Sequence, residues 1–348
     1  MSRGLLQTRA REAAAAPVAP DASPAGRPER RRPGLLAQIR ANRWSYAYLA
    51  PFVILVAVFT IYPIAASVGY TLYQWNGIGS PNHFVGLDNF RRVMGDSVFW
   101  RSFGHTFLYT GVLVPVQLLL ALVLAIVLNN RKLRFSTFYR SVYFLPAVMS
   151  PAIIAVVFQL LLSNFGTNLD VWLVKAHLLS QPVDWLGDPS TVMWVIIAIG
   201  IWNTLGYNLV YFLAGLQTIP EELYEAAAID GAGARQKFRY VTLPGLREVG
   251  VMILFLALLG SLQIFDLVQV LTGGGPYNAS SVVNTYIYQE AFGGGMSAGG
   301  GGMTVQPDIG FASAASFFYG LVLMVITVAQ ALVLRRMRNR RTANRAER

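Results

Sequence analysis

The sequence predicts an all-α integral membrane protein with six transmembrane helices. Hydrophobic residues make up 54 % of the 348 residues and charged residues only 13 %, whereas a soluble domain carries about 25 % charged residues. Six apolar segments are each long enough to cross the hydrocarbon core, which takes about 20 helical residues. Because lipid offers the backbone no hydrogen bonds, each segment is expected to be a helix. The expected spans are 46–73, 106–128, 141–162, 193–216, 251–272 and 310–334.

Lysine and arginine fall mainly on one side of these spans. Nine lie in 1–43, four in the 129–140 loop and seven after Leu334, whereas the loops on the other side carry Arg91, Arg92, Arg101 and Lys175. The positive-inside rule therefore places both termini in the cytoplasm. We expect 1–43 to be a disordered basic tail, 44–340 a transmembrane domain and 341–348 a second basic tail. The net charge of +11 needs no nucleic-acid partner to explain it.

Several kinds of site find no support in the composition. The chain has no cysteine, which excludes disulfides, thiolate metal ligands and a thiol nucleophile. His83, His105 and His177 lie far apart, so neither a metal nor another cofactor is expected. A glycine-rich stretch, Gly293–Met303, is expected to be a flexible connector.

Asp266 is the one ionisable residue deep inside an apolar segment. A charge at the bilayer centre costs about 2.5–3.5 kcal/mol on insertion scales, so such a residue usually faces a wet cavity. Alternatively, Asp266 lies near the outer helix end and reaches water, and both interpretations stay open. An ion-coupled carrier or channel working alone is the competing class of function, and a single acidic residue gives it little support.

The loop between the fourth and fifth spans, 217–245, has an unusual pattern for a simple connection. Thr218 and Glu221 have the spacing of a capping box, which predicts a helix start. Gly231 is expected to end that helix in the left-handed conformation. A second short helix is expected from Ala234 to Tyr240, ended by Pro244. The alanines of the first helix, Ala226 to Ala228, have small side chains, so another protein could approach this helix closely. Glu225 beside them offers a carboxylate to a basic partner.

This loop resembles the EAA motif of binding-protein-dependent ABC permeases. The motif has Glu-Ala-Ala, then glycine, an aliphatic residue and Leu-Pro at fixed spacing, and Val241 stands here where isoleucine is more usual. Segments 85–90, 183–186 and 271–276 also look like parts of sugar permeases of the maltose/glycerol-3-phosphate type, so the resemblance covers most of 45–340. The residues that match the motif or complete its helix are Glu225, Ala226, Ala227, Asp230, Gly231, Leu243 and Pro244.

The resemblance implies a transport subunit rather than an enzyme. No Walker A sequence occurs, so ATP hydrolysis is expected on two copies of a separate ATPase subunit, into which the EAA helix docks. A second homologous permease would complete the pathway, an extracytoplasmic solute-binding protein would deliver the solute, and membrane lipid would surround the spans. The seven motif residues would then couple ATPase motion to the spans.

The resemblance also implies a substrate site near mid-membrane, on the spans before the EAA loop and before the Gly-Gly-Gly-Pro turn. Amide, hydroxyl and aromatic groups there suit a weakly held polyol. No basic residue lies within the six spans, so a neutral sugar or oligosaccharide is expected. The same residue types also suit packing between transmembrane helices, which remains the alternative. The candidate pathway residues are Asn203, Thr204, Tyr207, Gly260, Ser261, Ile264 and Asp266.

Overall fold

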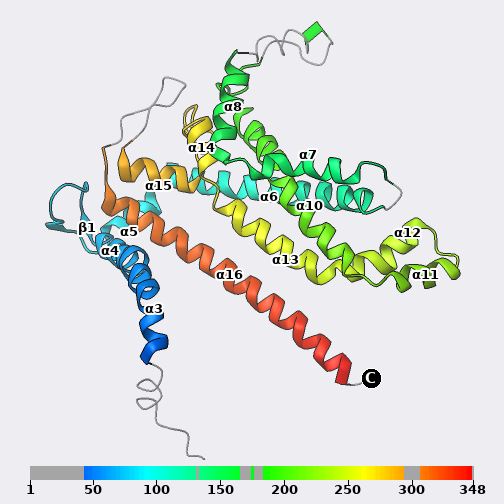
Figure 1. Cartoon of the computed structure of the whole chain (residues 1–348). Coiled ribbons are helices and arrows are strands. Elements are labelled where there is room, and N and C mark those ends of the chain that lie inside the picture. The colour runs from blue at the N-terminus through cyan, green and yellow to red at the C-terminus, as the bar shows by residue number, and fades with distance from the viewer. Residues whose placement is uncertain (1–42, 131–132, 165–173, 176–182, 294–305, 347–348) are drawn as a thin grey trace, which may run out of the picture. The chain divides into compact units, whose positions relative to one another are not determined.

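The computed structural model describes residues 43–130, 133–164, 174–175, 183–293 and 306–346 (Figure 1). The chain divides into two compact units between Tyr62 and Pro63. Apart from Arg43, the expected tail 1–43 lies outside the described residues, as does nearly all of the glycine-rich connector. The helices before the first loop are α3 (Arg43–Val56), the π-turn η1 (Ala57–Ile61) and α4 (Tyr62–Tyr70).

The second unit is almost entirely helical. A two-stranded antiparallel hairpin, β1 (Tyr73–Gln74) and β2 (His83–Phe84), pairs Tyr73 with Phe84. The helices that follow are α5 (Asp88–Gly95), α6 (Ser97–Leu128), α7 (Ser136–Val148), α8 (Pro151–Asn164), α10 (Val192–Gln217), α11 (Glu221–Ile229), α12 (Ala234–Lys237), η2 (Phe238–Thr242), α13 (Leu243–Leu262), α14 (Asp266–Leu271), α15 (Val283–Phe292) and α16 (Ile309–Ala346).

Five stretches of helix in the described part of the chain are long and apolar enough to cross a membrane, and a bent pair makes a sixth if it is one span. They correspond to the six expected segments. The helix of the last span does not end with its apolar part, because α16 continues through the basic residues to Ala346. The five stretches are Ala47–Tyr70, Ser97–Leu128, Val192–Gln217, Ala234–Leu271 and Ile309–Met337.

The third expected span, 141–162, is not one straight helix. It consists of parts of α7 and α8, which are bent by 93° with respect to each other. Met149 between them is extended, with φ −77° and ψ 144°. Pro151 opens α8, lacks the N–H that a continuous helix would use, and disfavours helical geometry in the residue before it. The break therefore follows from a proline whose effect the apolar pattern does not show.

Both π-turns lie next to a proline. The Tyr62 N–H bonds the Ala57 oxygen just before Pro63, and the Leu243 N–H bonds the Phe238 oxygen just before Pro244. The expectation that Pro244 ends the second short helix of the 217–245 loop is wrong. The wider turn of η2 accommodates Pro244 in the first turn of α13, so helical backbone runs from Ala234 to Leu262.

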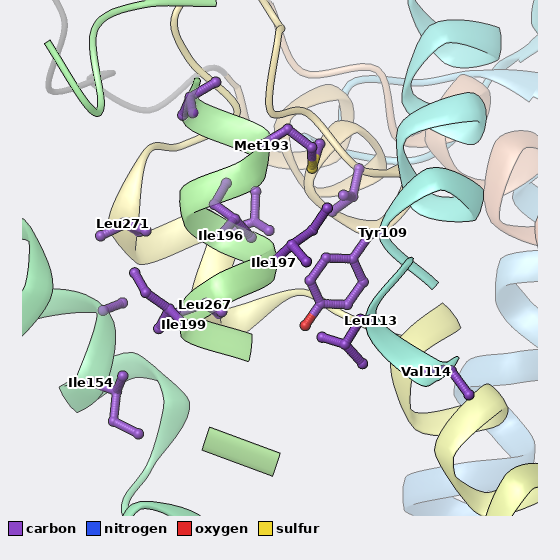
Figure 2. Packing of buried hydrophobic residues seen from close by; sticks show 14 residues of the cluster. Tyr109, Leu113, Val114, Ile154, Met193, Ile196, Ile197, Ile199, Leu267 and Leu271 are labelled. Atoms are coloured by element: carbon purple, nitrogen blue, oxygen red, sulfur yellow. The ribbon is translucent and has the colours of Figure 1, made fainter. Parts of the chain in front are cut away.

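The core forms where α10 packs against α6, α7 and α13 (Figure 1). Close up, Ile197 of α10 lies beside Tyr109 of α6 (Figure 2). Leu113 and Ile196 belong to the same buried cluster, and these side chains are nearly inaccessible to solvent. Gly206 allows the close approach of α10 to α7, because a Cβ there would lie 2.6 Å from the Tyr143 carbonyl oxygen. Small residues at helix contacts are the usual means of tight packing in membranes.

A charge cluster ties α5, α6, α15 and α16 together. Arg92 Nη1 donates to Asp308 Oδ2 at 2.9 Å. The Asp96 carboxylate caps α6 by accepting two backbone N–H groups, and it also accepts the Tyr286 hydroxyl at 3.0 Å. Burial, and then the nearby Asp96 and Asp308 carboxylates, raise the pKa of Glu290 to about 7, although Arg92 acts in the opposite direction.

Replacing Glu290 by glutamine is expected to remove a pH-dependent loss of stability. The folded chain holds a proton on Glu290 up to a higher pH than the unfolded chain does. The contribution of Glu290 to the free energy of unfolding is therefore most favourable below the unfolded pKa of about 4.3 and is lost as pH rises through about 7. Above pH 7 we expect Glu290→Gln to be more stable than the parent by on the order of 1 kcal/mol, after discounting for partial exposure.

Thermal unfolding in detergent between pH 4 and pH 8 measures this difference. The gap between variant and parent should open as pH rises and then stay constant above pH 7. Glu222 is an exposed glutamate on α11, so Glu222→Gln serves as the control. A gap that is the same at every pH would contradict the assignment.

Candidate functional site

The 217–245 loop folds into a bracket, defined here as α11, α12 and the turn between them. A Schellman motif ends α11, as the Ala232 N–H bonds the Ala227 oxygen at 2.9 Å and the Gly231 N–H bonds the Ala228 oxygen at 3.1 Å. Gly231 has φ +75°, the left-handed conformation expected from the sequence. The bracket lies at one end of α10 and α13, and α14 and α15 lie at the other end (Figure 1).

The helix start differs from the sequence-based expectation. α11 begins at Glu221 with Pro220 before it, and no side chain caps it. Thr218 lies too far upstream to act as the N-cap, and its hydroxyl instead donates to the Gly215 oxygen at 2.7 Å. The predicted capping box of Thr218 and Glu221 is therefore wrong, although a helix does begin there.

One face of α11 is exposed and the other is anchored. The Tyr224 hydroxyl lies 3.1 Å from Thr242 Oγ1, which joins α11 to η2. On the outer side, Ile229 is 88 % exposed. Sequence reasoning missed this residue and two other exposed apolar residues of the region, Leu223 and Tyr240, which a search for apolar side chains on polar helices could have found. The expected coupling residues Glu225, Ala226, Asp230, Gly231, Leu243 and Pro244 are exposed, and Ala227 is half-buried.

A cavity of about 520 Å³ lies between α6, α10 and the junction of α13 with α14. This volume is within the range of small-molecule sites. All seven candidate pathway residues lie on its wall, although they come from two spans some 50 residues apart in sequence. The seven are Asn203, Thr204, Tyr207, Gly260, Ser261, Ile264 and Asp266.

The cavity wall combines amides, hydroxyls and aromatic rings. Sequence reasoning missed about half of the polar and aromatic groups, which include two α6 residues and two residues of the break between α13 and α14; no linear signal connected these to the pathway. These additional residues are Gln117, Asn208, Gln263, Tyr109, Tyr211 and Phe265. Asp266 is the single carboxylate, and neither lysine, arginine nor histidine lies on the described wall.

Several of these polar groups hold the wall itself. Asn203 Nδ2 donates to the Pro146 oxygen at 2.8 Å, which fixes α10 to α7. The Thr204 hydroxyl contacts Gln117 Oε1 and donates to the Gly200 oxygen at 2.8 Å. Tyr207, by contrast, is 44 % exposed, and its ring packs edge-on against Phe144. Tyr207 is therefore more available to a solute than Asn203 is.

Asp266 is not inside a continuous helix. It is the first residue of α14, after a break from Gln263 to Phe265. Of the two interpretations left open by the sequence, Asp266 facing a cavity agrees with its place on the wall. Its carboxylate also lies at the positive end of α14, where negative charge is favoured.

A profile of the family described as "Binding-protein-dependent transport system inner membrane component" matches residues 117–339. The chain belongs to this family. It is a multi-pass membrane protein and a transport subunit. The probable ABC transporter permease protein YurN of Bacillus subtilis (strain 168) is 34 % identical over 290 residues, which cover 83 % of this chain and 93 % of YurN.

Other relatives in the family have named solutes. The lactose transport system permease protein LacF of Rhizobium radiobacter is 33 % identical over 83 % of this chain and 92 % of LacF. Among solved structures, a bacterial ABC transporter involved in the import of the acidic polysaccharide alginate superposes with a TM-score of 0.70 at 23 % identity, over 87 % of this chain and 98 % of that chain. The structural match establishes the permease fold.

Proposed function

We propose that this chain is the membrane-spanning subunit of an ATP-driven importer and forms, with a second permease, the pathway for a neutral carbohydrate. The cavity carries this proposal. Its amides and hydroxyls offer hydrogen bonds to sugar hydroxyls, and its aromatic rings offer apolar faces. The relative LacF is named a lactose transport system permease protein. AraP of Bacillus subtilis (strain 168) is named an arabinooligosaccharides transport system permease protein, and it is 32 % identical over 83 % of this chain.

The charge of the wall favours a neutral solute. Asp266 would repel a carboxylate, and no described cationic side chain on the wall would offset that repulsion. We therefore expect a uronic-acid oligosaccharide to compete poorly with a neutral sugar for transport. Strong competition by the acidic oligosaccharide would contradict the neutral class while leaving the transport role intact.

The bracket supports a coupling role for Glu225, Ala226, Ala227, Asp230, Gly231, Leu243 and Pro244. An exposed helix with a flat alanine surface suits a cleft on an ATPase subunit, and Glu225 would pair with a basic residue there. Two ATPase copies would drive the two permeases between inward-facing and outward-facing states.

Both termini would lie on the cytoplasmic side of the inner membrane, and a solute-binding protein would dock on the opposite side. The similar alginate importer has been solved in complex with an alginate pentasaccharide-bound periplasmic protein.

Replacing Tyr207 by alanine is expected to raise the apparent KM for uptake about ten-fold, because an accessible aromatic face is removed from the cavity. Uptake is measured in vesicles holding both permeases, the ATPase and the binding protein. Tyr139 has nearly the same exposure, 43 % against 44 %, and does not border the cavity, so Tyr139→Ala is the matched control.

Ser261→Leu tests the same wall by filling the cavity. Ser261 is 5 % exposed, and a leucine there is expected to lower uptake strongly. If neither Tyr207→Ala nor Ser261→Leu alters the kinetics, the solute passes elsewhere. If uptake continues without any ATPase subunit, a carrier working alone replaces the importer.

A further inference from the structure

The break between α13 and α14 forms much of the cavity wall. α13 ends at Leu262, α14 begins at Asp266, and Phe265 between them has φ −150° and ψ −66°. Gln263, Ile264 and Phe265 all border the cavity. Irregular backbone inside a span is tolerated only where its polar groups find partners in the protein or in cavity water. The positions of these three residues therefore depend on what bonds the freed carbonyl groups.

Two side chains from other helices bond these carbonyl groups. The Tyr319 hydroxyl of α16 donates to the Leu262 oxygen, and Asn284 Nδ2 of α15 donates to the Ile264 oxygen at 3.3 Å. Neither Tyr319 nor Asn284 borders the cavity itself. Each therefore acts on the wall through the backbone of the break.

Tyr319 is held firmly enough to fix the break. Its side chain is 3 % exposed, and its ring packs edge-on against Phe103 of α6. The buried cluster around it also includes Phe99, Phe311 and Ala315. A tyrosine packed in this way offers its hydroxyl in one direction, which here is the end of α13.

We propose that Tyr319 and Asn284 are positioning residues of the cavity. Their side chains hold the backbone of the break so that Gln263, Ile264 and Phe265 face a solute in one arrangement. The relevance of this positioning to transport rests on the proposed function. The positioning itself is a property of the fold and is tested without transport.

The chain has no cysteine, so Ser261→Cys provides a single reporter beside the break. Ser261 borders the cavity and is 5 % exposed, and its backbone carbonyl oxygen, which the substitution leaves in place, accepts the Ile264 N–H at 3.3 Å. The measurement is the rate at which a hydrophilic maleimide labels this cysteine in the assembled, nucleotide-free transporter. Adding Tyr319→Phe, which removes one hydroxyl, is expected to raise that rate about three- to ten-fold, as the loss of one buried hydrogen bond predicts.

Tyr286→Phe is the matched control. It also removes a buried hydroxyl from the same cluster, but this hydroxyl donates to Asp96 and not to the break. Labelling with Tyr286→Phe should equal the parent rate, and Asn284→Ala should resemble Tyr319→Phe. Equal rates in all of these variants, or the same increase with Tyr286→Phe, would overturn the positioning role. Either result leaves the proposed transport function untouched, because that function is tested by Tyr207→Ala uptake.

Discussion

Replacing Gly231 by proline is expected to abolish the stimulation of ATP hydrolysis by loaded binding protein. Proline fixes φ near −65°, whereas Gly231 has φ +75°. Proline also removes the N–H that bonds the Ala228 oxygen in the Schellman motif. The end of α11 would unwind, and the exposed face with Glu225 and Ala226 would no longer be presented to the proposed ATPase subunit. ATPase rates of the reconstituted complex, with and without loaded binding protein, measure the effect.

Gly233→Pro is the matched control for this experiment. Gly233 lies two residues further along the same exposed turn and has φ −70°, which proline adopts readily. Proline there also removes one hydrogen-bonded N–H, which donates to Gln236 Oε1 at 2.8 Å, so the two variants differ mainly in the φ angle that the site requires. No added Cβ at Gly231 would meet another atom within 4 Å, so the effect at Gly231 is one of backbone geometry rather than of crowding. Normal stimulation in Gly231→Pro would remove the bracket from the coupling mechanism.

Replacing Gly206 by valine is expected to destabilise the chain by about 3 kcal/mol or more. A Cβ there would lie 2.6 Å from the Tyr143 oxygen and 2.9 Å from the Phe144 Cα, and neither backbone atom can move aside without moving α7. Separation of α7 from α10 would also break the hydrogen bond from Asn203 to the Pro146 oxygen. The melting temperature and the yield of monodisperse protein in detergent report the loss.

Gly111 of α6 offers the corresponding control. An added Cβ at Gly111 meets nothing within 4 Å, and the residue is exposed. Gly111→Val should therefore leave the melting temperature close to that of the parent. Equal losses from Gly111→Val and Gly206→Val would mean that valine harms these helices in general and that the close approach of α10 to α7 is not the cause.

The sequence allowed the apolar spans, the bracket and the α10 and α13–α14 sides of the cavity to be predicted, because these depend on local patterns and on the resemblance. The left-handed Gly231 followed from its place after an alanine helix. All seven candidate pathway residues border one cavity, since the resemblance assigned them to two particular spans. Their role with a solute stays a prediction.

The features that the sequence did not predict depend on geometry between helices. Gln117 reaches the cavity only because α6 packs beside α10. The breaks at Met149 and at Gln263 to Phe265 lie inside continuous apolar runs, where hydropathy gives no boundary. Thr218 lies two residues before the observed N-cap, Pro220, and Pro244 lies within helical backbone, so local spacing rules alone placed neither helix end correctly.

The π-turn at Phe238–Thr242 makes the fifth span tolerant of a change in length at one place. A π-turn holds about one residue more than an α-helical turn, so deleting one residue there would restore a regular turn and leave the helical backbone on either side in nearly the same angular phase. Each α-helical residue turns the chain by about 100°. The same deletion in a regular turn of α13 would instead rotate the bracket by more than a quarter of a circle about the axis of α13, so the relation between the two ends of this span is a matter of angular phase.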